Sequence, residues 1–583
     1  MQWERGTHPC APRKLAPFCS TIRVSSVPAT LPFDPYEPRP TFLQRHRDPL
    51  VAAAVFALTV VMTVVSFPPF KASEFAYAML VPGIFWAYTR PRLKVYLLTM
   101  FAAQAVAWTI LLGWLHHVTW LGLFLLGPFV GAWISLWYPA LWWALPRIIG
   151  KPTLTRLVVV LGLAGVWVAI EWTRTWLLSG FPWLQFAASQ WERTSILQIA
   201  AFTGAYGVSF VLVMMNLGFA AYAHRLFREG ATGINRRSQE FFLALFLLLT
   251  CVSIHFQEAF NRRGFTAPLA RVAIVQPAIP QDVKWDPSRA PAILDVLQQT
   301  TLEAAKLRPD VILWPEAVTP LAVRGDAAVQ GFVEGLVKRA NVPVLLGSIA
   351  VENPGTPEET WRNGAFLVTP EGGLAARSYA KRQLVPFGEF VPLRPLLGWL
   401  SKFVPIGGDF QPGEDSSPLL LPVRGQPIVW GPLICYEDVY PALARYSSLA
   451  GANVLTVLTN NGWFGEGGAA YQHAAHAVLR AVENRRPVIR CGNAGWSGWI
   501  DEFGVVRATL TDATGSIYFR GVRALDVTRD SRWIERNSFY TLHGDWFVLV
   551  CGALAAFGYA LLRVAPPSGA SPPASDQRSP PPP

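Results

Sequence analysis

The sequence predicts a multi-span α-helical membrane bundle joined to one α/β domain. Hydrophobic residues make up 52% of the 583 residues and charged residues only 15%, whereas charged residues form roughly 25% of an average globular domain. The apolar residues gather in runs of membrane-spanning length before residue 258 and again at 546–562. Between these regions, strand-like and helix-like patterns alternate, which is typical of a layered α/β domain.

Charge and cysteine content argue against several classes of protein. The formal net charge is +12, but the basic residues recur between the apolar runs, where membrane-orientation signals belong. We therefore predict no nucleic-acid partner. Six cysteines are scattered without CxxC or zinc-like spacing, so we expect neither a disulfide framework nor a zinc site built on them.

Polar segments flank the predicted bundle at both ends. Residues 1–48 are rich in proline and arginine and lack the apolar core of a signal peptide, which predicts a disordered tail. Residues 563–583 are rich in proline and serine and are predicted to form a second tail.

Eight membrane spans are predicted, seven of them within residues 49–258. Their approximate ranges are 50–67, 75–88, 93–112, 118–145, 157–178, 204–223, 241–256 and 546–562. Each is close to the roughly 20 apolar residues that cross a hydrocarbon core, although the second is short. Basic residues cluster before the first span and after spans two, four and six. The positive-inside rule then places both tails in the cytoplasm and the α/β domain outside, an orientation that depends on the span count.

Two charged residues interrupt the fifth predicted span. Glu171 and Arg174 are three residues apart and can therefore pair on one helix face. Charges inside a membrane often mark a functional site. A purely structural pair near the end of the span is the alternative.

Residues 265–530 contain three reactive side chains, each just after a predicted strand. Glu316 follows VILW, Lys381 follows ARSYA and Cys435 follows IVWGPLI. Because α/β sheets bind ligands at the ends of their strands, the three can converge on one crevice. Together they provide a general base, a cation that stabilises thiolate and oxyanion, and a nucleophile. Taken singly, the charges are typical of solvated loops and the cysteine of a small buried hydrophobe.

The motifs around these residues resemble a known superfamily. The chain carries WPE at 314–316, KRQLVPFGE at 381–389 and CYE at 435–437, an order similar to the carbon–nitrogen hydrolase (nitrilase) superfamily with its Glu–Lys–Cys triad. With eight predicted spans and the segment GFPWLQFAASQ at 180–190, the chain resembles the apolipoprotein N-acyltransferase family. The resemblance implies a nitrilase-like αββα sandwich in the periplasm, anchored in a bacterial inner membrane.

The resemblance also implies substrates and supporting residues. The acyl donor would be a phospholipid and the acceptor a diacylglyceryl-apolipoprotein, N-acylated on its N-terminal cysteine by a ping-pong route through a Cys435 thioester. No metal or cofactor would take part. By matching position, five further residues would support the triad: Trp285, Asn363, Glu389, Tyr436 and Glu437. Asn461 stands where aspartate is common in the family, which leaves the role of its loop open.

Other interpretations stay open at this point. The apolar segment 396–408 is either a membrane-dipping lid over the site or a segment packed on its own domain. The alternative function is a membrane-anchored nitrilase-type amidase that hydrolyses a carbon–nitrogen bond. Seven spans before the domain favour a lipid substrate, because a simple anchor needs only one. The complete Glu–Lys–Cys set argues against an inactive binding module, and the few charges in the predicted spans argue against a transporter.

Overall fold

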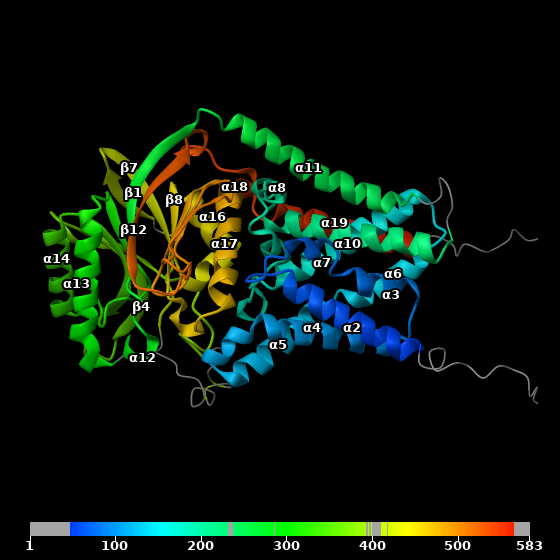
Figure 1. The fold of residues 1–583 in the computed structure, drawn as a ribbon, viewed down its shortest axis with the longest axis horizontal. Coiled ribbons are helices and arrows are strands. Elements are labelled where there is room, and N and C mark those ends of the chain that lie inside the picture. Colours follow the sequence, from blue (N-terminus) through cyan, green and yellow to red (C-terminus); the bar gives the residue numbers. More distant parts are fainter. Residues whose placement is uncertain are drawn as a thin grey trace, which may run out of the picture. The chain divides into compact units, whose positions relative to one another are not determined.

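The structure, a computed structural model, describes residues 47–230, 237–284, 286–391, 395, 398, 410–416 and 418–564. Within these ranges it contains a helical bundle and an α/β domain with two sheets (Figure 1). The predicted fold class is confirmed. Trp285 lies outside the described residues, as do nearly all of the 396–408 segment and of both predicted tails.

Seven helices of the described residues are long and apolar enough to cross a membrane. They are α2 (Arg47–Val65), α4 (Leu93–Leu111), α5 (Trp120–Ser135) continued by α6 (Tyr138–Ile148), α7 (Thr153–Thr173), α10 (Ala205–Phe227), α11 (Gln239–Asn261) and α19 (Trp546–Val564). In α10, 89% of the residues of an apolar 18-residue stretch are buried, whereas the corresponding share is only 17% in α11 and in α19. The bundle is therefore built around α10.

The second predicted span, already short in the sequence, is not one continuous helix long enough to cross a membrane. The prediction of eight helical spans is wrong at this position. The residues of this span fall on a short 3-10 helix, η1 (Ser73–Tyr77), and on α3 (Val81–Tyr88). The 8 residues of α3 rise only about 12 Å. Hydropathy reports how apolar a segment is, and it does not report whether the segment forms one continuous helix.

Asn216 of α10 satisfies the backbone where this segment is interrupted. Its Oδ1 accepts from the Leu80 N–H at 2.7 Å, and its Nδ2 donates to the Ala76 carbonyl at 2.8 Å. Farther along, Tyr88 stacks on His224 near the end of α10, with ring centroids 4.5 Å apart. Broken helices are tolerated at membrane depth where surrounding protein binds their backbone groups, so the segment still runs along the central helix.

The α/β domain contains two six-stranded sheets. The first has the order β12-β1-β2-β3-β4-β5 and the second β11-β10-β9-β8-β7-β6. Strands β1, β2 and β3 are parallel neighbours in the first sheet, as are β7, β8 and β9 in the second. The bounds are β1 (Thr266–Gln276), β2 (Val311–Trp314), β3 (Val344–Glu352), β4 (Thr360–Thr369), β5 (Gly373–Ala380), β6 (Leu419–Val423), β7 (Gln426–Ile434), β8 (Val454–Thr459), β9 (Val488–Gly492), β10 (Gly498–Ile500), β11 (Val506–Thr509) and β12 (Gly521–Asp530).

Helices cover the outer faces of both sheets, which makes the layer order αββα (Figure 1). Helices α13 (Ala290–Lys306) and α14 (Ala327–Ala340) cover the first sheet, and α16 (Pro441–Leu449) and α17 (Gly468–Asn484) cover the second. Apolar side chains of the two sheets form the core between them. On the outer side of the second sheet, the apolar cluster continues into the helical bundle. Helix α17 therefore lies between the sheet and the bundle.

Candidate active site

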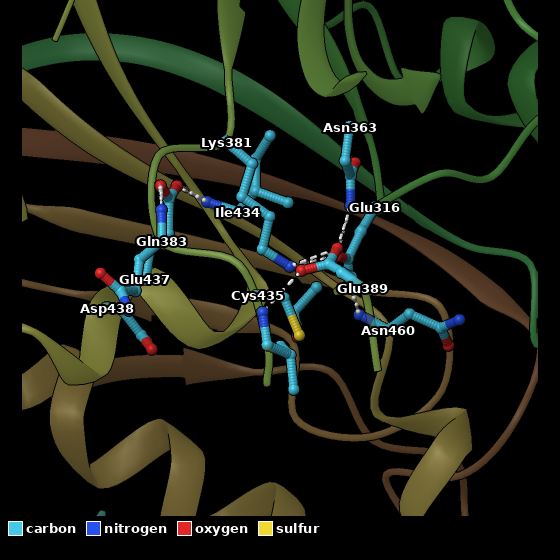
Figure 2. A network of polar contacts seen from close by, with 12 residues as sticks. Glu316, Asn363, Lys381, Gln383, Glu389, Ile434, Cys435, Glu437, Asp438 and Asn460 are labelled. Carbon is cyan, nitrogen blue, oxygen red and sulfur yellow. Dashed lines mark hydrogen bonds and ion pairs between the residues drawn. The ribbon is translucent and has the colours of Figure 1, made fainter. Parts of the chain in front are cut away.

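Glu316, Lys381 and Cys435 lie together where strands of both sheets end (Figure 2). Glu316 follows β2 and Lys381 follows β5 of the first sheet, whereas Cys435 follows β7 of the second. Their exposed fractions are 6%, 1% and 7%. Each sheet thus contributes to one enclosed group, with the two charged residues on the first sheet and the thiol on the second.

The Glu316 carboxylate is held by three donors. Its Oε1 accepts from Lys381 Nζ at 3.1 Å and from Asn363 Nδ2 at 2.9 Å, and its Oε2 accepts from the backbone N–H of Asn460 at 3.0 Å (Figure 2). Burial alone would raise the pKa of Glu316, but the positive charges of Lys381 and Lys284 outweigh it and lower that pKa. Glu316 is therefore a carboxylate at neutral pH, as a general base must be.

Lys381 lies between two carboxylates. Besides Glu316, its Nζ donates to Glu389 Oε1 at 2.9 Å. Burial acts to lower the pKa of Lys381, but the charges of Glu316 and Glu389 raise it well above its usual value. The side chain is a fixed ammonium in a nearly water-free setting, where a charge stabilises a developing oxyanion most strongly.

Cys435 occupies a tight turn between β7 and the 3-10 helix η8 (Cys435–Val439), with a φ of 51°. Its thiol lies beside the Glu316 carboxylate, near enough for the charge of Glu316 to act on it (Figure 2). Burial first, and the charge of Glu316 second, raise the pKa of the thiol to about 12, against the opposing effect of Lys381. The resting group is a thiol, so a nucleophile forms here only when the thiol passes its proton to a neighbouring base.

Two of the predicted supporting residues contact the triad. Asn363 Nδ2 donates to Glu389 Oε1 at 3.1 Å as well as to Glu316. Glu389 Oε2 accepts from the backbone N–H of Val385 at 2.9 Å, so its carboxylate is anchored at one oxygen and binds Lys381 with the other. This geometry suits a residue that orients the lysine.

Tyr436 and Glu437 have their contacts elsewhere. The ring of Tyr436 packs against Phe181 and Trp183 of the bundle, with centroids 6.2 Å and 6.5 Å away. Glu437 accepts from the backbone N–H groups of Ile434 and Arg382, each at 2.7 Å. Glu437 therefore ties the strand before Cys435 to the segment after Lys381 (Figure 2), and Trp285 lies outside the described residues.

Sequence reasoning missed two residues that contact the triad. Lys284, in α12 (Gln281–Lys284), is buried and donates from Nζ to the backbone carbonyl of Glu316 at 3.3 Å. Burial lowers the pKa of Lys284 to about 8. Asn460 acts through its backbone N–H, which carries no sequence signal. Each is the chain neighbour of a residue that the family resemblance singles out, Lys284 of Trp285 and Asn460 of Asn461, but neither was itself predicted.

Within the described residues, no group of three His, Cys, Asp or Glu side chains is arranged to hold a metal ion. The four described cysteines, Cys251, Cys435, Cys491 and Cys551, are free thiols. Cys491 lies on β9 and is fully buried between the sheets.

Glu171 and Arg174 of the bundle hold the loop that packs on Tyr436. Glu171 Oε1 accepts from the Phe186 N–H at 2.6 Å. Arg174 Nη2 donates to the carbonyls of Trp183 and Phe181 at 2.5 Å and 3.2 Å. No ion pair joins these two described side chains to each other. Instead of pairing, both bind the backbone of residues 181–186.

Comparison with known proteins identifies relatives for both parts of the chain. A family sequence model described as "Apolipoprotein N-acyltransferase N-terminal domain" matches residues 60–218, and one described as "Carbon-nitrogen hydrolase" matches residues 271–522. Among solved structures, an amidase from Nesterenkonia sp. has a TM-score of 0.34 and 21% sequence identity, covering 48% of this chain and 97% of the amidase.

Several similar curated proteins are named apolipoprotein N-acyltransferase. The protein of Geobacter metallireducens is 34% identical over 404 residues, covering 68% of this chain and 73% of the relative. That of Chlorobaculum tepidum is 29% identical over 456 residues, covering 74% and 82%, and that of Methylococcus capsulatus is 32% identical over 433 residues, covering 73% and 78%. This chain belongs to the apolipoprotein N-acyltransferase family, acyl-transferring enzymes within the carbon–nitrogen hydrolase superfamily.

Proposed function

We propose that this protein transfers an acyl chain from a phospholipid to the α-amine of the diacylglyceryl-modified N-terminal cysteine of apolipoproteins. The observation that carries the proposal is the convergence of Glu316, Lys381 and Cys435 in a domain whose α17 packs on a membrane-spanning bundle. The name of the curated relatives, apolipoprotein N-acyltransferase, supports N-acylation of an apolipoprotein.

In the first half-reaction, Cys435 attacks the ester carbonyl of the phospholipid. Glu316 takes the thiol proton as the C–S bond forms, and the carbonyl oxygen becomes an oxyanion that Lys381 stabilises. The ester C–O bond then breaks, and the proton passes from Glu316 to the departing glycerol oxygen. The products are a thioester on Cys435 and a lysophospholipid.

In the second half-reaction, the α-amine of the acceptor attacks the thioester carbonyl. Glu316 takes a proton from the amine as the C–N bond forms, Lys381 again stabilises the oxyanion, and the C–S bond breaks. The sulfur leaves as a thiolate and recovers its proton from Glu316. The enzyme returns to its starting state and the acceptor carries an amide-linked acyl chain.

We also propose that the α/β domain lies in the periplasm and that both tails lie in the cytoplasm. Although the second span is broken, its run along α10 keeps the number of crossings even. Exposed apolar side chains after α7, Trp176 at 50% and Leu178 at 71%, suit a membrane interface. A periplasm-specific reporter enzyme should be active when inserted at the exposed Gly355 and silent when fused after Val564. The reverse pattern would invert the topology.

Labelled phospholipid tests the proposed chemistry. Incubation should give an adduct on Cys435 that hydroxylamine removes and that Cys435→Ala abolishes. Cys491→Ala is the matched control, because the Cys491 thiol is occupied with the Val275 and Leu313 carbonyls at 3.4 Å and 3.3 Å. Label that survives in Cys435→Ala would mean that another nucleophile is used. Turnover of small amides without any lipid adduct would favour the amidase.

A further inference from the structure

Behind the Cys435 turn lies a second buried polar group that the proposed chemistry does not use. Asp438 follows the turn, His473 lies on α17 and Arg490 on β9, with exposed fractions of 0%, 1% and 0%. Asp438 Oδ1 is 2.7 Å from His473 Nε2, and Asp438 Oδ2 accepts from the Arg490 guanidinium. Buried charges are normally found paired, as here.

His473 binds the turn of the nucleophile directly. Its Nε2 lies 3.0 Å from the carbonyl oxygen of Cys435 and also faces Asp438. Because both neighbours are acceptors, Nε2 carries the proton and donates it. The φ of 51° at Cys435 is a left-handed conformation that costs a residue with a side chain about 1–3 kcal/mol. The turn therefore depends on what surrounds it.

The other ring nitrogen of His473 reaches the loop beside the base. Nδ1 lies 3.1 Å from Oδ1 of Asn461. The adjacent Asn460 donates its backbone N–H to Glu316 Oε2 at 3.0 Å. One imidazole thus connects the turn of Cys435 with the loop that holds Glu316.

Gln472, the preceding residue on α17, binds the bundle with its whole amide. Its Nε2 donates to the carbonyls of Pro68 and Leu111 at 3.1 Å and 2.9 Å. Its Oε1 accepts from the indole N–H groups of Trp114 and Trp183 at 3.0 Å and 2.9 Å. These contacts join α17 to the segments after α2, at the end of α4, before α5 and after α7.

His476, one turn after His473, strengthens the same connection. Its Nε2 accepts from the Leu184 N–H at 3.0 Å. The ring of the neighbouring Trp183 lies 5.4 Å from that of His473, centroid to centroid. Since Glu171 and Arg174 hold this loop from inside the bundle, bonded and packed groups connect the membrane helices to the Cys435 turn without interruption.

We propose that α17 couples the membrane bundle to the active site, with His473 as a positioning residue that sets the turn of Cys435. The inference rests on the proposed function, because it takes Cys435 as the acyl carrier. A shift of the bundle loops moves α17 through Gln472 and His476, and His473 moves with it. Because a misplacement of about 1 Å can cost about 10²-fold in rate, the coupling acts on the acylation step and leaves lipid binding unchanged.

The first test measures single-turnover acylation of Cys435 by labelled phospholipid, with the full-length protein in bilayer nanodiscs. His473→Leu removes the donor and should lower the rate constant about 10²-fold, with the half-saturating phospholipid concentration unchanged. His473→Gln keeps an N–H near the Nε2 position and should recover most of the rate. A wild-type rate in His473→Leu, or no recovery in a folded His473→Gln, would overturn the positioning role.

The second test addresses the coupling. Gln472→Met removes the bonds to the bundle without touching Cys435, and it should slow acylation as well. If both residues act through one path, the double variant with His473→Leu should be no slower than His473→Leu alone. The coupling would be contradicted if the fold-losses in rate of the two single variants multiplied in the double variant. A wild-type rate in Gln472→Met would contradict it as well.

Two controls separate the possible failures. Thermal unfolding of each purified variant identifies loss of fold, and if His473→Leu does not accumulate, Gln472→Met alone decides whether the bundle contact influences acylation. Wild-type protein that carries no label on Cys435 would count against the proposed function itself. In that case the question of coupling would not arise.

Discussion

The two halves of the αββα sandwich differ in what lies outside their helices. In α14, on the first sheet, 4 of 14 residues are buried, at Val329, Val333, Leu336 and Val337. In α17, on the second sheet, 15 of 17 residues are buried, because the helical bundle packs on its other face. One helix is an amphipathic cover and the other is enclosed on all sides.

The difference separates two tasks. The first-sheet half carries the charged residues of the site, Glu316 and Lys381, on strands whose outer helices face away from the bundle. The second-sheet half carries Cys435, and its outer helix buries polar side chains that bind both the nucleophile's turn and the bundle. Changes in the first half should therefore affect chemistry or local stability, whereas changes in α17 should affect the whole assembly.

The largest effect is expected from Glu316→Gln. Loss of the general base should slow acylation of Cys435 about 10²–10⁴-fold. The charge of Glu316 also raises the pKa of the Cys435 thiol, which stands at about 12, so its removal should lower that pKa. Alkylation of Cys435 by iodoacetamide against pH measures the shift. The exposed Glu303→Gln on α13 is the control. An unchanged or raised thiol pKa would refute the effect of the Glu316 charge on Cys435.

Arg480→Met tests the enclosed helix. Arg480 Nε and Glu483 Oε2 lie 2.9 Å apart with both side chains fully buried, and removing one partner of such a pair costs about 3–5 kcal/mol. By contrast, Lys338→Ala, at an exposed site of α14, should change the free energy of unfolding by less than about 0.5 kcal/mol. Denaturant unfolding in detergent compares the two. Equal effects would remove the distinction between the helices.

Glu389→Gln should have an intermediate effect on catalysis. The carboxylate binds Lys381 Nζ at 2.9 Å, and losing a charged hydrogen bond of this kind costs about 1.5–3 kcal/mol. Because Lys381 serves both half-reactions, thioester formation and transfer to the amine should slow together in single-turnover assays. Accumulation of acylated Cys435 would instead place Glu389 on the acceptor amine.

The smallest effect is expected at the start of α14. Asp326 caps this helix by accepting from the Val329 N–H at 2.9 Å, and Asp326→Ala should cost about 1 kcal/mol of stability. Acylation should stay at the wild-type rate. Asp326→Asn keeps the cap and is the matched control. Gly467, the residue before α17, has no side chain that caps that helix. A loss of acylation in Asp326→Ala would show that the first-sheet half is not independent of the second-sheet half.

Apolar runs and strand ends were enough to predict the two-part architecture and the convergence of three side chains. The runs VILW and IVWGPLI become β2 and β7, all or mostly buried, because a buried strand must be apolar along its length. Glu316 and Cys435 follow those strands, and the structure places their side chains beside each other (Figure 2). Local hydrophobicity predicts such strands because the free energy gained on burial depends on each residue's own side chain.

Only the tertiary structure decided where polar groups find partners from distant segments. The second span breaks where Asn216, more than a hundred residues later, binds its backbone, and α17 buries Gln472 and His473 because the bundle and the Cys435 turn satisfy them. Asn460 binds the Glu316 carboxylate through its own backbone N–H, and the Lys284 side chain binds the backbone carbonyl of Glu316. A buried polar group is stable only with a bonded partner, and nothing in the local sequence specifies a partner that folding brings from elsewhere.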